Sequence, residues 1–237
     1  MEPAEYQLMD AAEDGMWWYR ALHARLLAAL AGIEGRVLDA GCGTGGLLTR
    51  LHATRPELDA FGVEWSEQAS QRAAAKSGAA IARGSVNALP FADATFAAAV
   101  VADLLCHRAV DAERALAELH RTLRPGGRLI VNMPAYAWLL SAHDRRVHNV
   151  RRQTAGELTA MLRAAGFRRV RARYWNSLLL PLMLVQRKLL ARDGAASDVA
   201  PFPPWLDATL HAITEFERRL PFALPAGGSV LATAERP

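Results

Sequence analysis

Short apolar runs alternate with segments of helical periodicity along most of this chain. The apolar runs have the length and composition of strands and lie at residues 36–40, 60–64, 79–83, 94–101, 128–132, 167–175 and 228–235. Segments between them repeat apolar residues at helical spacing, as in Ala115, Leu116, Leu119 and Leu123. This alternation predicts an α/β fold, with a mostly parallel sheet covered by helices on both faces.

Polar residues mark where several of these helices should begin. Ser66 and Asp111 are placed to cap two helices, and Thr154 with Glu157 matches a capping box. The turn Arg124–Gly127 (Arg-Pro-Gly-Gly) should lead into the strand at 128–132. Residues 5–31 read as one or two helices with a break near Gly15.

The pattern changes before the last strand. Residues 176–226 carry two apolar helical stretches and a proline-rich joint, which we interpret as a helical cap inserted into the fold. The chain is therefore expected to form a single domain, 1–237. Its parts are an N-terminal helical segment (1–32), a cofactor-binding core (33–175), the cap (176–226) and the last strand (227–237).

Composition narrows the class of protein. Of the 237 residues, 51% are hydrophobic and 22% are charged, which indicates a folded globular chain. The two cysteines, Cys42 and Cys106, have no paired spacing, and residues 1–10 lack a signal pattern. The longest apolar run, 178–185, is too short to cross a bilayer. A cytoplasmic protein is the expectation.

The net charge of +4 is modest, but basic residues cluster. Nine arginines and one acid lie between Arg145 and Arg173. Such a cluster can attract an anionic substrate, a membrane surface or nucleic acid, or it can simply form solvated faces.

The sharpest chemical signal is the glycine-rich run 37–46, Val-Leu-Asp-Ala-Gly-Cys-Gly-Thr-Gly-Gly, between a strand and a helix. Glycines allow a tight turn and close approach to a ligand, which binds at the carboxyl ends of such strands. The run also satisfies the dinucleotide-binding pattern, and Glu64 at the end of the next strand suits a ribose in either case. Asp39 favours a ligand amine, because a carboxylate would repel pyrophosphate.

Four segments together resemble the successive motifs of class I S-adenosylmethionine-dependent methyltransferases, especially the group related to ubiquinone-biosynthesis methyltransferases. They are residues 39–46, Glu64, residues 84–91 and residues 123–129. The resemblance covers roughly residues 15–175. It implies a Rossmann-like, seven-stranded, mostly parallel sheet with an antiparallel last strand, and S-adenosylmethionine as the cofactor.

The resemblance also implies roles for residues around the cofactor. Gly41 and Gly43 would line its methionine part with Asp39 near the amine, and Glu64 would hold the ribose. Trp65 would pack on the adenine and Ser85 and Val86 would border it, although the family more often has aspartate at the Ser85 position. Ala102 and Asp103 would lie beside the sulfonium. Tyr19 and Arg20, in a segment also found in relatives, would cover the pocket and pair with the carboxylate, or else pack on the sheet.

Methylation of a hydroxyl group requires a base, which is commonly histidine near neutral pH. His107 follows the fourth strand, and His143, Asp144 and His148 follow the fifth, so both loops leave the expected binding edge. Asp144 could orient His148 if that loop is helical. Alternatively, these side chains only hold loops together. As a metal site the set is incomplete, and no metal is expected.

The aromatic and leucine-rich segments of the cap suggest a lipophilic acceptor. We therefore expect a small-molecule methyltransferase, acting on oxygen of a lipophilic or aromatic metabolite. Alternatives are methylation of RNA or another polyanion, a binding protein without turnover, and an NAD oxidoreductase. Peripheral membrane contact through Arg187, Lys188 and Arg192 is a further hypothesis.

Overall fold

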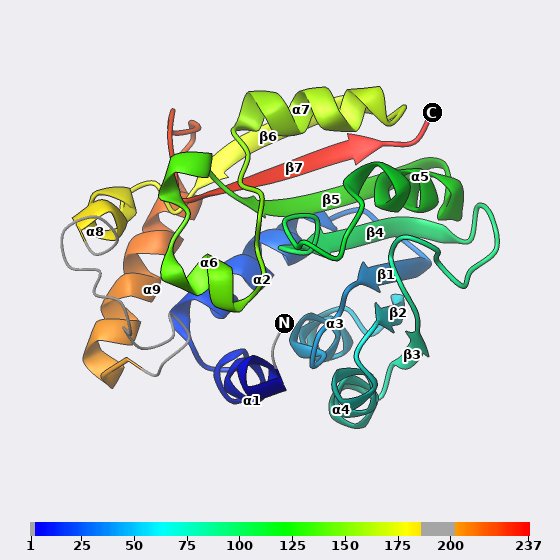
Figure 1. Ribbon diagram of the computed structural model, residues 1–237, viewed down its shortest axis with the longest axis horizontal. Coiled ribbons are helices and arrows are strands. Elements are labelled where there is room, and N and C mark those ends of the chain that lie inside the picture. The colour runs from blue at the N-terminus through cyan, green and yellow to red at the C-terminus, as the bar shows by residue number, and fades with distance from the viewer. Residues whose placement is uncertain (1–2, 186–201) are drawn as a thin grey trace.

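The computed structural model describes residues 3–185 and 202–237 and contains one seven-stranded sheet (Figure 1). The strand order is β3-β2-β1-β4-β5-β7-β6, and β7 runs antiparallel to both of its neighbours. The strands are β1 Arg36–Ala40, β2 Asp59–Glu64, β3 Ala80–Arg83, β4 Phe96–Ala102, β5 Leu123–Pro134, β6 Arg168–Trp175 and β7 Ser229–Glu235. The predicted Rossmann-like sheet with an antiparallel last strand is confirmed.

Helices cover both faces of this sheet. One face carries α5 and α7, and the other carries α2, α3 and α4. The described helices are α1 Pro3–Ala12, α2 Trp17–Ala29, α3 Gly46–Thr54, α4 Glu67–Ser77, α5 Ala112–Thr122, α6 Ala142–Arg146, α7 Ala155–Ala164, α8 Leu180–Leu184 and α9 Pro204–Arg218, with a 3-10 turn at Ala137–Leu139.

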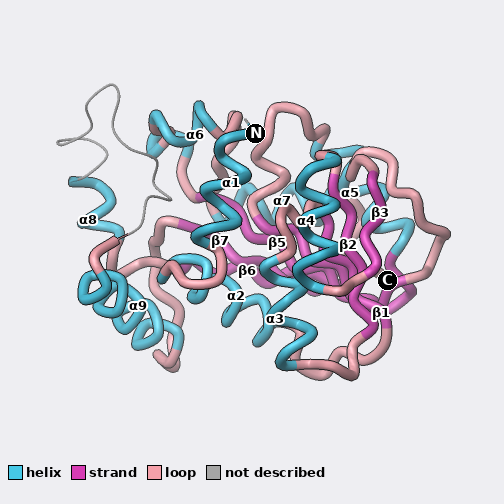
Figure 2. Tube along the Cα trace, turned by 90° about the horizontal axis from the view of Figure 1, so that it is seen from below, coloured by secondary structure: helices cyan, strands magenta, loops and turns pink. Residues whose placement is uncertain are grey.

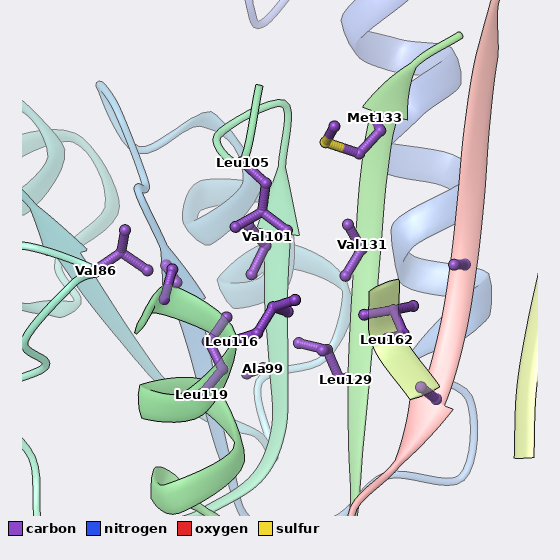
Figure 3. Packing of buried hydrophobic residues seen from close by; sticks show 14 of the residues in the cluster. Val86, Ala99, Val101, Leu105, Leu116, Leu119, Leu129, Val131, Met133 and Leu162 are labelled. Carbon is purple, nitrogen blue, oxygen red and sulfur yellow. The ribbon is translucent and has the colours of Figure 1, made fainter. Parts of the chain in front are cut away.

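Side chains along the central strands point alternately to the two faces of the sheet, so each face has its own part of the core. Ala99 and Val101 of β4 pack with α5 and α7, whereas Ala98 and Val100 of the same strand pack on the opposite face. Figure 3 shows Val101 and Val131 from adjacent strands above Leu116 and Leu162 of the covering helices. A strand buried on both sides must be apolar throughout, which explains why residues 96–101 read as one continuous apolar run.

The predicted helix starts are confirmed at three positions. The Ser66 hydroxyl accepts a hydrogen bond from the backbone of Ala69, and the Asp111 carboxylate accepts from Glu113 and Arg114. Thr154 and Glu157 form the reciprocal capping box. Strand ends differ from the predicted ones by one or two residues, except that β5 begins earlier, at Leu123, before the Pro-Gly-Gly turn.

The N-terminal segment and the insertion pack together. Arg25 of α2 is buried, donates to the carbonyl of Thr214 on α9, and lies 4.6 Å from the ring centre of Trp175. Its nearest acid is Glu217, whose carboxylate accepts the backbone N–H groups of residues 177 and 178. Figures 1 and 2 both show α8 and α9 at one end of the molecule, away from β3. The division into four parts stays a prediction.

Six of the nine arginines in the cluster form two contrasting groups in the structure. Arg151 and Arg152 turn inward and donate to a backbone carbonyl or a carboxylate, as described below. In contrast, Arg168, Arg169, Arg171 and Arg173 are exposed on β6, an edge strand of the sheet. Charged side chains on an edge strand hinder pairing with other chains, so this group has a structural explanation.

No helix within residues 3–185 and 202–237 is long and apolar enough to span a membrane. The basic residues 187, 188 and 192, which we associated with membrane contact, lie outside the described residues.

The cap of α7 gives a test of the local structure. We expect Thr154→Ala to lower the free energy of unfolding by about 1 kcal/mol, because the substitution removes the acceptor for the backbone of Glu157. Thr159→Ala is the matched control, since the Thr159 hydroxyl only donates to a carbonyl within the same helix. Urea unfolding measures both variants, and equal losses would contradict the capping role.

Candidate active site

A cavity of about 320 Å³ lies at the carboxyl ends of the parallel strands. Its floor includes Asp39, Glu64 and Asp103, from the ends of β1, β2 and β4. Residues of α1 and α2 also line it, together with the segments after β5 and β6. Because this edge collects the ends of several strands, residues distant in the sequence meet around one space.

The glycine loop shapes one wall of this cavity. Gly41 and Gly43 line it with φ angles of 80° and 55°, in the left-handed region that favours glycine. Gly45, with φ of 93°, begins α3 so close to α4 that a Cβ atom would lie 2.9 Å from the backbone of Ala73. The loop therefore needs glycine both for its turn and for helix packing.

Glu64 is buried and fixes the other side of the loop. One carboxylate oxygen, Oε2, accepts from the backbone N–H of Gly43 at 3.1 Å. The other, Oε1, accepts from the backbone of Ser66 at 2.9 Å and from the hydroxyl of Tyr6 at 3.1 Å. Tyr6 belongs to α1, so the N-terminal helix is attached to the glutamate that the resemblance assigns to the ribose.

Asp39 lies next to two further acids. Burial, and then the charges of Glu13 and Glu64, raise the pKa of Asp39 to about 8. Glu13, on the loop after α1, accepts from the hydroxyl of Thr44 at 2.6 Å and pairs with Lys76 of α4 at 2.8 Å. Lys76 therefore offsets part of the negative charge of this group of acids.

Asp103 is held by a chain of hydrogen bonds that crosses the sheet. Both of its carboxylate oxygens accept from the amide of Asn132 on β5 at 3.0 Å, and the Asn132 oxygen accepts from the indole of Trp175 at 2.8 Å. Burial raises the pKa of Asp103 to about 7. Its backbone has a φ of 49°, which turns the chain sharply at the end of β4.

The charge of the cavity indicates what it can hold. Asp39, Glu64 and Asp103 face it, and Arg152 is the one arginine or lysine among its described lining residues. That arginine donates to both oxygens of Asp144, so it does not neutralise Asp39, Glu64 or Asp103. The cavity fits a ligand with positive charge, such as an ammonium or sulfonium, and is a poor environment for pyrophosphate.

Residues 37–127 match the family model described as a methyltransferase domain. A ubiquinone/menaquinone biosynthesis C-methyltransferase from Syntrophotalea carbinolica is 31% identical over 197 residues, which cover 70% of this chain and 81% of that protein. This chain belongs to the class I S-adenosylmethionine-dependent methyltransferases. A protein of the same name from Desulfotalea psychrophila is 35% identical over 130 residues, and the match covers 52% of this chain but only half of that relative.

A solved structure from Thermotoga maritima, described as a possible histamine N-methyltransferase, has the same fold. Its TM-score is 0.63 at 22% identity, with 99% of this chain and 95% of that chain covered. The cofactor of this methyltransferase is S-adenosylmethionine, and its amine and sulfonium match the positive charge that the three cavity acids require.

Not all residues assigned to the cofactor lie at the cavity. Tyr19, Asp39, Gly41, Gly43, Glu64, Ala102 and Asp103 line it. Arg20 instead pairs with Asp207 of α9 at 2.5 Å, and Trp65 is 74% exposed. Ser85 accepts from the backbone of Asn87, and Val86 is buried in the core on the α5 side of the sheet. The structure therefore brings together the residues that the resemblance assigns to the methionine part and the ribose, and leaves those assigned to the adenine, and Arg20, outside the cavity wall.

The candidate catalytic residues also divide into some that line the cavity and some that do not. His107 lines the cavity, whereas His148 is exposed beyond the end of α6 and does not line it. Asp144 also lines the cavity but is buried, with its oxygens bound to Arg152 and Ser141. The side chain of His143 lies outside the described part of the chain. Among the described residues, no group of three or more metal-ligating side chains forms a metal site.

Sequence reasoning missed several lining residues. Tyr6, Glu13 and His23 come from the N-terminal helices and their joint, where nothing local distinguishes them from surface or core positions. His23 is buried, and burial lowers its pKa to about 4. Asn132, which does not line the cavity but donates to Asp103, carried a signal that could have been used, because it is a polar residue within the apolar stretch 129–133 of β5.

Tyr6 gives a test of the cofactor site. The resemblance assigns the carboxylate of Glu64 to the ribose hydroxyls, and the Tyr6 hydroxyl already donates to Oε1 of that carboxylate. We expect Tyr6→Phe to bind S-adenosylhomocysteine about tenfold more tightly, since the substitution removes this competing hydrogen bond to a charged group. Titration calorimetry measures the change. Glu64→Ala should weaken binding in the same assay. Weaker binding by Tyr6→Phe would show that the hydroxyl helps to hold the ligand.

The pKa of Asp39 predicts a pH dependence of cofactor binding. Below about pH 8 the carboxyl group is largely protonated, and a positively charged amine beside it favours the ionised form. We therefore expect affinity for S-adenosylhomocysteine to rise with pH, by at most about tenfold per unit, and to level off near pH 8. Calorimetry between pH 6 and pH 8 should also detect proton release. Asp39→Asn should bind weakly with a flatter pH profile, and an unchanged profile would rule out Asp39 as the coupled group.

Proposed function

We propose that this chain transfers the methyl group of S-adenosylmethionine to oxygen of a small lipophilic or aromatic acceptor, with His107 as the base. The observation that carries the proposal is the continuity of one cavity. The cavity includes the carboxylate cluster at Asp39 and Glu64, and it also includes the apolar side chains of Trp17, Met183 and Phe202. A cofactor site and an apolar acceptor site can therefore share one cavity.

The cofactor supplies a methyl group activated by the positive sulfonium. Within this chain, Asp39 and Glu64 bind the cofactor and orient it. Asp103 places negative charge at the end of β4. The N-terminal helices exclude water, because α1 and α2 both contribute to the cavity wall. What remains for the protein is alignment of the acceptor and removal of its proton.

His107 is the candidate histidine best placed for proton removal. It is the only one of the three whose described side chain lines the cavity. Burial lowers the pKa of His107 to about 4, so the imidazole is unprotonated at neutral pH and can accept a proton. Asp103 is a competing candidate, because its pKa of about 7 lies nearer to neutral pH than that of His107, and a general base works best when its pKa is near the working pH.

The curated relatives named above are C-methyltransferases, so carbon is the alternative methyl-accepting atom. Removing the proton of a phenol increases the electron density on its oxygen and on the neighbouring ring carbons. The same base therefore serves both reactions, and the position of the new methyl group must be determined from the product.

The polyanion alternative has less support. Four exposed arginines of the cluster lie on the edge strand β6, and Arg151 and Arg152 are engaged inside the fold. The other alternative is a protein that binds S-adenosylmethionine without turnover. Such a protein would differ from the proposed enzyme only in forming no methylated product.

Activity is tested by incubating the protein with S-adenosylmethionine and a panel of neutral phenols, hydroxyquinones and aliphatic alcohols. We expect a product 14 mass units heavier than one acceptor, by the replacement of H with CH3, and nuclear magnetic resonance then locates the methyl group. Binding of S-adenosylhomocysteine without product from any acceptor would favour the protein without turnover.

The pH dependence of turnover tests the base. With His107 in this role, kcat should stay level from pH 8 to about pH 5 and fall only as the pH approaches 4. His107→Gln should lower kcat about 100-fold or more with little change in S-adenosylhomocysteine affinity. His148→Gln, at an exposed position, is the matched control. A fall centred near pH 7 that disappears in Asp103→Asn would assign the base to Asp103 instead.

A further inference from the structure

Two side chains in the apolar part of the cavity have polar atoms without partners. Asn176, directly after β6, is 2% exposed, and its Oδ1 accepts no hydrogen bond from any described residue. Trp17, the first residue of α2, is 8% exposed, and its Nε1 likewise donates to none. Both line the cavity together with Met183 and Phe202.

Unpartnered polar atoms are uncommon in buried positions because each loses its hydrogen bonds to water. The amide nitrogen of Asn176 has only a weak acceptor, the Met183 sulfur at 3.4 Å. The backbone N–H of Trp17 does have a strong partner, Asp207, at 2.7 Å. One acceptor and one donor are therefore unused. Both atoms are covered in this structure, so a rotation of each side chain is needed to bring them to the cavity surface.

Backbone conformation accounts for only part of this arrangement. Asn176 has a φ of 57°, a left-handed conformation that asparagine and glycine adopt more readily than other residues. Glycine would meet that requirement without burying an amide. Similarly, phenylalanine at position 17 would fill the apolar cluster with Leu179 and Leu210 without an indole N–H.

The charges around the cavity select against an anionic acceptor. Arg152 is the one permanently positive lining residue within the described ranges, and Asp144 accepts from it through both oxygens. Asp39, Glu64 and Asp103 also face the cavity. A phosphate or carboxylate on the acceptor would find repulsion there and no free cation.

We propose that Trp17 and Asn176 form an acceptor-recognition subsite for a neutral molecule that presents both a hydrogen-bond donor and a hydrogen-bond acceptor on an apolar body. Asn176 Oδ1 takes the donor, and Trp17 Nε1 gives its proton to the acceptor atom. The assignment rests on the proposed function, because it treats this part of the cavity as the acceptor site. It adds the selection of a neutral, hydroxyl-bearing or amide-bearing molecule by two residues separate from the proposed base.

The test uses four probes on one ring system: 2-naphthol, 2-methoxynaphthalene, naphthalene and 2-naphthyl phosphate. Each is titrated calorimetrically into the full chain saturated with S-adenosylhomocysteine, so turnover is not needed. We expect 2-naphthol to bind about fivefold to tenfold more tightly than 2-methoxynaphthalene, which lacks the donor. Naphthalene should bind more weakly still, and 2-naphthyl phosphate most weakly.

Two variants test whether the binding preferences depend on Asn176 Oδ1 and on Trp17 Nε1. Asn176→Gly keeps the left-handed backbone and should remove the preference for 2-naphthol over 2-methoxynaphthalene. Trp17→Phe keeps an aromatic ring and should reduce the preference for 2-methoxynaphthalene over naphthalene. Trp205→Phe, at a position 69% exposed on α9, is the matched control and should behave like the unaltered protein. S-adenosylhomocysteine affinity in each variant reports on folding.

Three outcomes would overturn the subsite: tighter binding of the phosphate, equal binding of 2-naphthol and 2-methoxynaphthalene, or no binding of 2-naphthol by protein that binds S-adenosylhomocysteine. A preference for 2-naphthol over 2-methoxynaphthalene that persists in Asn176→Gly would also overturn the subsite. The asparagine would then be needed only for the left-handed backbone conformation at this position. Failure to bind S-adenosylhomocysteine at all contradicts the proposed function itself, so the two failures are distinguishable.

Discussion

The active site depends on the burial of carboxylates at the carboxyl edge of the sheet. Asp39, Glu64 and Asp103 end three strands, and the helices around them limit access to water. A carboxyl group whose pKa is higher in the folded than in the unfolded state binds a proton more readily when folded. Asp39, with a pKa of about 8, therefore destabilises the fold increasingly as the pH rises from about 4 to about 8. Binding a cation beside these groups reverses that effect, so the same burial that costs stability favours the cofactor.

The strands, most helices and the glycine loop could be predicted because their signals are local. The continuous apolar run of β4 and the capping residues Ser66 and Thr154 act within a few positions of the elements that they define. Asp39 and Glu64 could be placed for a related reason. Each ends a strand next to a recognisable turn, and the parallel sheet brings those ends together.

Partners that are distant in the sequence could not be predicted in this way. Arg20 has the charge to bind a carboxylate, but α9 places Asp207 beside it, 187 positions further along the chain. Asp144 has a sequence neighbour of suitable spacing in His148, but spacing did not predict its ion pair with Arg152, which forms because the chain turns after α6. In both cases the ion pair is formed by tertiary packing, and spacing along a helix carries no information about it.

The N-terminal helices connect the two halves of the cavity. Lys76 of α4 contacts Asp10 and Glu13, which attaches the end of α1 to the cofactor side, while Trp17 and Arg20 attach α2 to α9 on the acceptor side. The break near Gly15 separates these two attachments. Movement of α1 could then open the space above Glu64 without disturbing the residues that face the acceptor. The two attachments differ in burial: the α2–α9 contacts include the buried Arg25, whereas the ion pairs of Asp10 with Arg72 and Lys76 are partly exposed. Partly exposed ion pairs contribute little stability, so the attachment of α1 depends more on the buried pair of Lys76 with Glu13 and on the hydrogen bond from Tyr6 to Glu64.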